Sequence, residues 1–236
     1  MCRSLTATAA MAAAGGAAAV VTLRRGDPPG VPLTLGWFAL MEVPQLGGYL
    51  TLDRCGTPAN ETVTFLSVLH IAFQPLFINA FAMTLVPPPS RTLRAAVFGL
   101  SGLAAAVALL QLHPFAWAGA CTPGATLCAE RLCTVSGEWH IAWEVPYNGL
   151  LGPLDRLTGL HWGFHGYMAA VFVLPLVYGA WRFVLFHALA GPILAGQLTS
   201  DPNEIPAIWC LFSIGILPIA LSPRVRRLFE ARPVAA

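Results

Sequence analysis

Polar side chains that could bind a metal ion or transfer protons occur inside the most apolar parts of this chain. The stretch 62–86, TVTFLSVLHIAFQPLFINAFAMTLV, is long enough to cross a bilayer as one helix, yet it contains His70, Gln74 and Asn79. His70 and Gln74 are four residues apart, so both project from one face of a helix. Because a polar stripe is costly in hydrocarbon, we expect this face to point into a helical bundle and to mark a functional site.

Carboxylates occur in similar surroundings. Glu42 lies in the middle of the apolar stretch 31–52, where a carboxyl group must be protonated, paired or bound to a metal. Asn203 and Glu204 stand at the start of the last apolar stretch. There they either belong to the functional site or form a turn in which Asp201 or Asn203 caps the following helix.

Two further pairs have a spacing suited to metal binding. His140 and Glu144 are four residues apart, as are His161 and His165, which lets one helix face supply two ligands. Imidazole and carboxylate together suit zinc, iron or manganese. The predicted metal ligands are Glu42, His70, His140, Glu144, His161 and His165. Glu42 and Glu144 are also the predicted catalytic carboxylates, and Gln74, Asn79, Asn203 and Glu204 are the predicted cofactor-binding residues.

This set leads to two hypotheses of different kinds. The first is a metal-dependent membrane enzyme, in which zinc would imply hydrolysis of a lipid amide or ester and iron would imply oxidation of a lipid-soluble substrate. The second is a non-enzymatic membrane protein: a sensor, a transporter-like module or an accessory subunit that docks against partner membrane subunits. Its polar residues would then form a buried structural network or a proton path.

The composition predicts an integral membrane protein. Hydrophobic residues make up 56% of the chain and charged residues only 10%, which leaves no room for a soluble domain of ordinary size. All 13 basic residues are arginine, and the absence of lysine excludes a retinal Schiff base. The arginine-rich C-terminal tail is typical of an anchor at the membrane surface, and we expect no nucleic-acid partner.

The elements that must position these residues form one all-α domain over residues 1–236, a bundle of about seven transmembrane helices. The predicted spans are 1–23, 31–52, 62–86, 95–112, 160–181, 183–198 and 204–221. The first stretch has a competing interpretation as a cleaved signal peptide. The stretch 140–150, HIAWEVPYNGL, is too short and too polar for a span, and we expect a short re-entrant or interfacial helix there.

Seven spans predict an orientation in the membrane. With the N-terminus outside, the arginine-bearing loops and the C-terminal tail all fall on the cytoplasmic side, as the positive-inside rule favours. The predicted location is a bacterial inner membrane. If the stretch 140–150 also crossed, the basic C-terminus would be stranded outside.

The same orientation places four cysteines together. Cys121, Cys128 and Cys133 lie in an extracytoplasmic loop of about 112–138, and Cys55 lies in another outer loop. Two disulfides are expected on this oxidising side, with three possible connectivities. Structural disulfides are favoured over thiol exchange because no CxxC motif is present.

Several long motifs resemble one family. MCRS, LHIAFQPLFINAFAM, LLQLHPFAWAG, GEWHIAWEVPYNG, VLPLVYGAWRF and DPNEIPAIWCLFSIG are similar to an uncharacterised group of bacterial polytopic membrane proteins that share a domain of unknown function. The resemblance covers nearly the whole chain, although that group has Trp where this chain has Arg3. It implies a helical protein of the bacterial inner membrane and implies no activity.

A second, partial likeness concerns the type of reaction only. Ser67, His70, His161 and His165 echo the zinc site of the seven-helix hydrolases of the alkaline ceramidase and progestin-receptor superfamily. The spacing differs, because Ser67 stands three rather than four residues before His70 and no matching aspartate follows. We therefore treat this likeness as an analogy.

Overall fold

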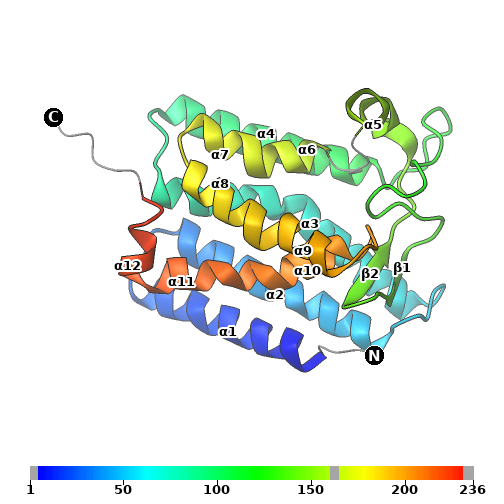
Figure 1. The fold of residues 1–236 in the computed structure, drawn as a ribbon, viewed down its shortest axis with the longest axis horizontal. Coiled ribbons are helices and arrows are strands. Elements are labelled where there is room, and N and C mark those ends of the chain that lie inside the picture. Colours follow the sequence, from blue (N-terminus) through cyan, green and yellow to red (C-terminus); the bar gives the residue numbers. More distant parts are fainter. Residues whose placement is uncertain (1–4, 160–164, 231–236) are drawn as a thin grey trace.

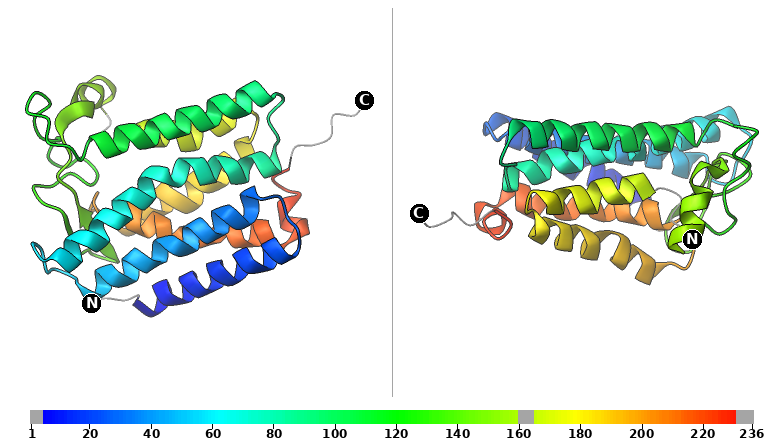
Figure 2. Two further views of the ribbon diagram at one scale, coloured as in Figure 1. Left: turned by 180° about the vertical axis from the view of Figure 1, so that it is seen from behind. Right: turned by 90° about the horizontal axis from the view of Figure 1, so that it is seen from above.

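Four helices form one layer of the bundle. The computed structural model describes residues 5–159 and 165–230. Successive helices are antiparallel neighbours, as the views from the front and from behind show (Figures 1 and 2). They are α1 (Leu5–Arg24), α2 (Gly30–Leu50), α3 (Pro58–Leu85) and α4 (Arg91–Leu110). α3 lies in the middle of the molecule, because it packs against α2 and α4 in its own layer and against α7 of the second layer.

Three interrupted helical rods form the second layer, in front of the first in Figure 1. The rods are α6 (His165–Met168) with α7 (Leu174–Val177), α8 (Trp181–Ala188) with α9 (Leu194–Leu198), and α10 (Ile205–Phe212) with α11 (Ile216–Leu221). A short helix, α12 (Pro223–Arg226), follows. The hydrophobic core lies between the two layers and includes Met41, Phe81, Phe183 and Ile208, all fully buried.

Three helices can cross a membrane by length and composition within the described residues. These are α1, α3 and α4, and they indicate a membrane-associated protein. The rods 165–177 and 205–221 are apolar but shorter. The expectation of about seven transmembrane helices is therefore supported for three of them, and for the others it stays a prediction. α1 and α4 expose most of their apolar surface, as helices in contact with lipid do.

One end of the bundle carries a two-stranded sheet and a short helix, α5 (Gly152–Thr158), and we call it the hairpin end. The expected short helix over 140–150 is wrong. Strand β2 (Ile141–Glu144) pairs antiparallel with β1 (Cys133–Ser136), with Ser136 opposite Ile141. β-Branched and aromatic residues favour this pairing, and Pro146 disfavours a helix that continues past β2.

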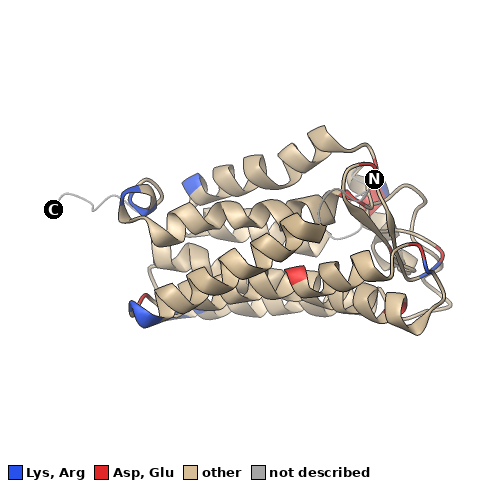
Figure 3. Cartoon of the chain, turned by 90° about the horizontal axis from the view of Figure 1, so that it is seen from below, with Lys and Arg blue, Asp and Glu red and all other residues tan. Residues whose placement is uncertain are grey.

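Charge separates the two ends of the molecule (Figure 3). Most acidic residues lie at the hairpin end. The opposite end carries Arg24, Arg25, Arg91, Arg94, Arg182, Arg224, Arg226 and Arg227, and we call it the arginine end. This asymmetry agrees with the arrangement that the positive-inside rule favours, while the orientation in a bacterial inner membrane stays a prediction.

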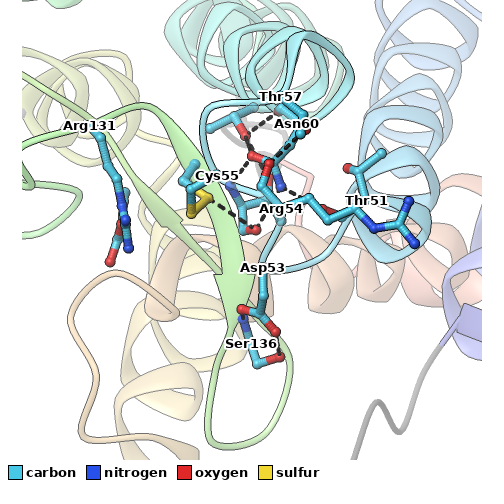
Figure 4. Close-up of a disulfide and its surroundings, with 12 residues drawn as sticks. Thr51, Asp53, Arg54, Cys55, Thr57, Asn60, Arg131 and Ser136 are labelled. Carbon is cyan, nitrogen blue, oxygen red and sulfur yellow. Dashed lines mark hydrogen bonds and ion pairs between the residues drawn. A yellow bond between two sulfur atoms is a disulfide. The ribbon is translucent and has the colours of Figure 1, made fainter.

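Both expected disulfides form at the hairpin end. Cys55 pairs with Cys133, and Cys121 pairs with Cys128. The first bridge joins the α2–α3 loop to β1 (Figure 4). Beside it, the carboxylate of Asp53 accepts hydrogen bonds from the Ser136 backbone N–H at 2.8 Å and from the Ser136 hydroxyl at 2.6 Å. The hairpin is thus tied covalently and by hydrogen bonds to the first layer.

Candidate functional site

Glu204 is a fully buried carboxylate at the start of α10. It accepts hydrogen bonds from the backbone N–H groups of Glu138 at 3.0 Å, of Trp139 at 2.7 Å and of His140. The Thr199 hydroxyl donates a further bond at 2.5 Å. Consecutive N–H groups in a turn form a concave site for an anion. Glu204 is therefore the anion that holds the loop before α10 against the turn of the hairpin.

Gly137 is part of the same arrangement. A Cβ atom at this position would lie 2.5 Å from Cδ of Glu204, closer than real Cβ atoms approach their neighbours. Glycine at this position therefore lets the carboxylate reach the three N–H groups without a shift of the Glu204 side chain or of the turn. The motifs GEWH and DPNE, which are far apart in the chain, are thus the two halves of one contact.

His140 points from the hairpin turn toward α2. Its Nδ1 is hydrogen bonded to the Tyr49 hydroxyl, and its Nε2 lies 2.8 Å from Oε1 of Gln45. Burial lowers the pKa of His140 to about 4, against the opposing effect of the Glu204 carboxylate. The ring is therefore neutral near pH 7, and because a carbonyl oxygen only accepts, Nε2–H donates to Gln45 and Nδ1 accepts from Tyr49.

Glu42 and Gln45 lie on the same face of α2, deeper in the bundle. Both side chains are buried, with 3% and 0% of their surface exposed. Neither Oε2 of Glu42 nor Nε2 of Gln45 has a hydrogen-bond partner among the described residues. Since buried polar atoms are almost always satisfied by protein or ordered water, this pair of unpaired atoms requires an explanation.

His70 lies against aromatic rings. Its ring stacks on Trp37 with a centroid distance of 4.1 Å, and Trp37 stacks on Phe77 at the same distance. Nε2 of His70 has no hydrogen-bond partner within the described ranges. The stack joins α2 to α3, which gives His70 a packing role whatever else it does.

Gln74 and Asn79 connect α3 to the second layer. The Gln74 amide donates to Sγ of Cys210 at 3.4 Å and accepts from the Tyr167 hydroxyl at 2.7 Å. Asn79 accepts from the Tyr178 hydroxyl at 2.9 Å and donates to the carbonyl oxygen of Ala170 at the same distance. Both amides use their donors and acceptors within the bundle, which is typical of polar residues that fix helix packing.

Two predicted site residues lie elsewhere on the hairpin. Glu144 forms an ion pair with the exposed Arg131 at 2.9 Å, and its side chain reaches solvent. His140 and Glu144 therefore do not share a helix face, because the segment that carries them is a turn and a strand. The Asn203 carbonyl accepts from the Trp143 backbone N–H at 3.0 Å, so Asn203 joins the loop before α10 to β2.

The described residues give the predicted zinc or iron centre no support. Within ranges 5–159 and 165–230, no group of three or more His, Cys, Asp or Glu side chains is placed to hold a metal ion. Both ring nitrogens of His140 are engaged, and Glu144 pairs with Arg131. His161 lies outside the described residues.

Sequence reasoning missed three polar residues that position the hairpin. Gln45 and Tyr49 follow Glu42 on one face of α2, and this spacing could have identified them. Asn60 donates to the carbonyl oxygens of Thr51 at 2.8 Å and Thr134 at 2.9 Å, and accepts from the Thr134 N–H at 2.9 Å. Nothing in the sequence indicates that Asn60 meets a strand more than seventy residues away.

The described part of the molecule has a groove of about 800 Å³ in the second layer, which we call the lateral groove. One wall is the α6–α7 rod with Phe172, another is the α8–α9 rod with Ala188 and Ile193, and Trp209 of α10 forms the floor. Its volume lies within the roughly 300–1,000 Å³ of typical ligand pockets. The lining is almost entirely apolar.

Two irregular helical segments contribute residues to the walls of the lateral groove. The segments Ala169–Val173 and Leu189–Ile193 are both π-helical, and each interrupts the rod that forms one wall. Gly191 has non-helical dihedral angles, with φ −102° and ψ −109°, and Pro192 follows it. Any Cβ atom at Gly191 would collide with the ring of Trp209. Such π-helical turns widen a helix and occur often at functional sites.

Polar side chains gather at the mouth of the lateral groove, toward the hairpin end. Nδ1 of His165 lies 3.5 Å from Oδ1 of the buried Asp155, and its Nε2 lies 3.3 Å from the Thr158 hydroxyl. His165 and Thr158 both line the groove. The groove is therefore amphipathic along its length, with hydrogen-bonding groups at one end and hydrocarbon beyond.

Comparison with known proteins identifies one family. The model of a family of unknown function, DUF5765, matches residues 6–230. No curated protein matches the chain, and no solved structure matches it. The match agrees with the resemblance to an uncharacterised family, while the bacterial origin and the individual motifs stay predictions. Membership of this family supplies no activity for the chain.

Proposed function

The chain belongs to this family of unknown function, and we propose that it is a membrane protein that binds a lipid-soluble molecule in the lateral groove. The molecule has one long apolar tail and a single hydrogen-bonding head. The observation that carries the proposal is the polarity of the groove, in which His165 and Thr158 stand at one end and Thr126 is the one further polar residue of the described lining.

The length of the groove suits an alkyl or isoprenoid tail. Along the α6–α7 rod it extends from His165 to Val173, which is about 12 Å at the rise of an α-helix. Phe172, Ile193 and Trp209 line this part. Transfer of a tail from water to such a lining is favourable by roughly 0.8 kcal/mol for each buried CH₂ group.

The head would lie beside the His165 and Thr158 side chains. Asp155 is almost fully buried behind His165, with 5% of its side chain exposed, so it orients the imidazole. The Thr158 hydroxyl donates to the carbonyl oxygen of Leu154 at 2.8 Å, and a hydroxyl oxygen can also accept a hydrogen bond, which suits a hydroxyl head. A head with more than one phosphate would be repelled by the negative charge of Asp155. No arginine among the described residues that line the groove would compensate for that repulsion.

Photolabelling tests the proposal directly. The probe is 1-hexadecanol with a diazirine at the end of its chain, added to the full-length protein in detergent and irradiated. We expect labelled peptides from the groove, around Phe172 and Ile193. Excess unlabelled 1-hexadecanol should compete with this labelling, because a built site saturates whereas bulk contact with detergent-dispersed lipid does not.

A matched pair of variants separates the groove from the general lipid-facing surface. Ala169 is exposed and lines the groove, and Ala106 is exposed on α4, outside it. Ala169→Trp fills the groove and should lower the saturable labelling by about tenfold, equivalent to 1.4 kcal/mol. Ala106→Trp adds the same ring elsewhere and should leave it unchanged.

Two outcomes would contradict the proposal. One is equal labelling of α4 and the groove without competition, which would make the groove an ordinary lipid-facing surface. The other is a dimer that Ala169→Trp dissociates, which would make the groove an interface between two copies of the chain.

A further inference from the structure

The unpaired polar atoms of Glu42 and Gln45 form a second feature, separate from the lateral groove. The two residues are three apart on α2, about one helical turn, so their side chains are neighbours. One atom is an acceptor, Oε2 of Glu42, and the other is a donor, Nε2 of Gln45. A water molecule that lies between them would satisfy both.

A small cavity beside Glu42 has room for one water molecule, which would lie against Glu42 and not against Gln45, because Gln45 is not among the residues that line it. It measures about 20 Å³ and lies between α1, α2 and the α10–α11 rod. Gly15, Ala39 and Ser213 belong to its lining. A cavity needs roughly 10–15 Å³ and at least two polar partners to hold one water molecule, and Glu42 with Ser213 provides them.

The polar face of α2 continues from this cavity to the hairpin end. Gln45 accepts from His140, and His140 accepts from Tyr49. Glu42 and Tyr49 are seven residues apart, about 10 Å along the helix axis. Hydrogen-bonding groups therefore stand at successive turns from the end of α2 to the middle of the bundle, and of these Glu42 and Tyr49 can also exchange a proton.

We propose that Glu42 is a proton-binding residue that exchanges its proton with the hairpin end through Gln45-bound water and the His140–Tyr49 pair. In the uptake step a hydronium ion at the hairpin end gives up one proton and becomes water, while the Glu42 carboxylate gains one proton and becomes neutral, so the charge of the bundle rises by one. Chains of Glu, His and water are the usual proton paths inside membranes.

No arginine or histidine is among the described residues that line the cavity beside Glu42. Besides the residues already named, the lining consists of Met11, Leu35, Phe38, Ile214, Ile216 and Leu217. Cys210 of α10, in the second layer, is a titratable group close enough to Glu42 to interact with it electrostatically. A proton is therefore the one cation that the site can accommodate without a new ligand.

Infrared spectroscopy of the full-length protein in lipid films tests this proposal. Protonation of Glu42 produces a carboxyl C=O band that Glu42→Gln should abolish, whereas Glu144→Gln should leave it unchanged because Glu144 is at the surface. Transfer into D₂O should shift the band rapidly in the wild-type protein. Gln45→Met, which keeps the side-chain length and removes the amide, should slow that shift by about tenfold.

The controls make each result decisive. Ser101→Ala removes a buried polar group on α4 and should not alter the exchange rate. A carboxyl band that survives in Glu42→Gln would overturn the proposal, as would equal exchange rates in Gln45→Met and the wild type. Photolabelling of the lateral groove depends on none of these residues, so this proposal and the proposed function fail separately.

Discussion

The carboxylate of Glu204 accepts a hydrogen bond from the backbone N–H of Trp139 at 2.7 Å, across a sequence separation of 65 residues. Two flanking N–H groups of the same turn donate to the same carboxylate. Buried and anionic, Glu204 replaces water for three backbone donors that would otherwise be unsatisfied. This contact joins the second layer to the hairpin that the disulfides attach to the first.

Glu204→Gln should destabilise the protein. An amide of the same size turns an N–H₂ group toward backbone N–H donors or leaves one donor unpaired, which costs about 2 kcal/mol. Thermal unfolding in detergent measures the loss. Glu144→Gln is the control, since its exposed pair with Arg131 contributes about 0–1 kcal/mol. Equal melting temperatures for Glu204→Gln and the wild type would contradict the role of Glu204.

Gly137→Ala should be destabilising for a steric reason. The added Cβ would stand 2.5 Å from Cδ of Glu204, so the carboxylate or the turn must move, at a cost of about 1–3 kcal/mol. In a Glu204→Ala background the obstacle is gone, and the same substitution should cost less. A double-mutant cycle measures this coupling. Additive effects would show that the two positions do not meet.

The stability of the hairpin end should fall in mild acid. The pKa of His140 is lowered by burial to about 4 in the folded protein, while an unfolded histidine titrates near 6.5. Between these values the unfolded chain binds more protons, so stability is lost as the pH falls from about 6.5 to about 4, by up to about 3 kcal/mol.

Melting curves at a series of pH values check this dependence. His140→Gln should flatten the curve over that interval, although it lowers stability at neutral pH. The carboxyls of Glu138 and Asp201 titrate close by, with the pKa of Glu138 lowered by hydrogen bonds from Ser200 and that of Asp201 raised by burial. Because both remain in the variant, the difference between the two curves isolates His140.

The two disulfides should contribute unequally. Cys55 and Cys133 are 78 residues apart, whereas Cys121 and Cys128 are 7 apart. Because the stabilisation grows with the length of the closed loop, removal of the first bridge should cost about 4 kcal/mol and removal of the second about 2 kcal/mol. Paired Cys→Ser variants compared by thermal unfolding test the order. A larger loss for the Cys121–Cys128 variant would contradict it.

Chelation should leave the protein folded. The polar contacts that hold the hairpin run through Glu204, His140 and Asn60, and each is made to protein groups. Prolonged treatment with EDTA should therefore not change the melting temperature, and mass spectrometry should find no stoichiometric zinc or iron. Stoichiometric metal that disappears in His70→Ala would restore the first hypothesis of a metal-dependent enzyme.

Helix positions and the ends of the bundle were determined by the sequence itself. The predicted span 62–86 corresponds to α3 at 58–85, and the predicted span 204–221 to the rod 205–221. Runs of apolar residues are local signals, so they identify helices without knowledge of their partners. Each helix takes the chain from one end of the bundle to the other. The number of helices between two loops therefore predicts that the loop arginines lie at one end and the four loop cysteines at the other.

The tertiary structure decided which residues meet. Ile141–Glu144 is a strand because Cys133–Ser136 lies beside it, and no local pattern reveals a pairing partner. Helical spacing placed His70 and Glu42 on helix faces but could not measure the distance between those faces, and for His140 it was wrong because His140 lies on a turn. The groups that bind Glu204 are backbone N–H groups, which every residue carries, so only the folded turn makes them a site.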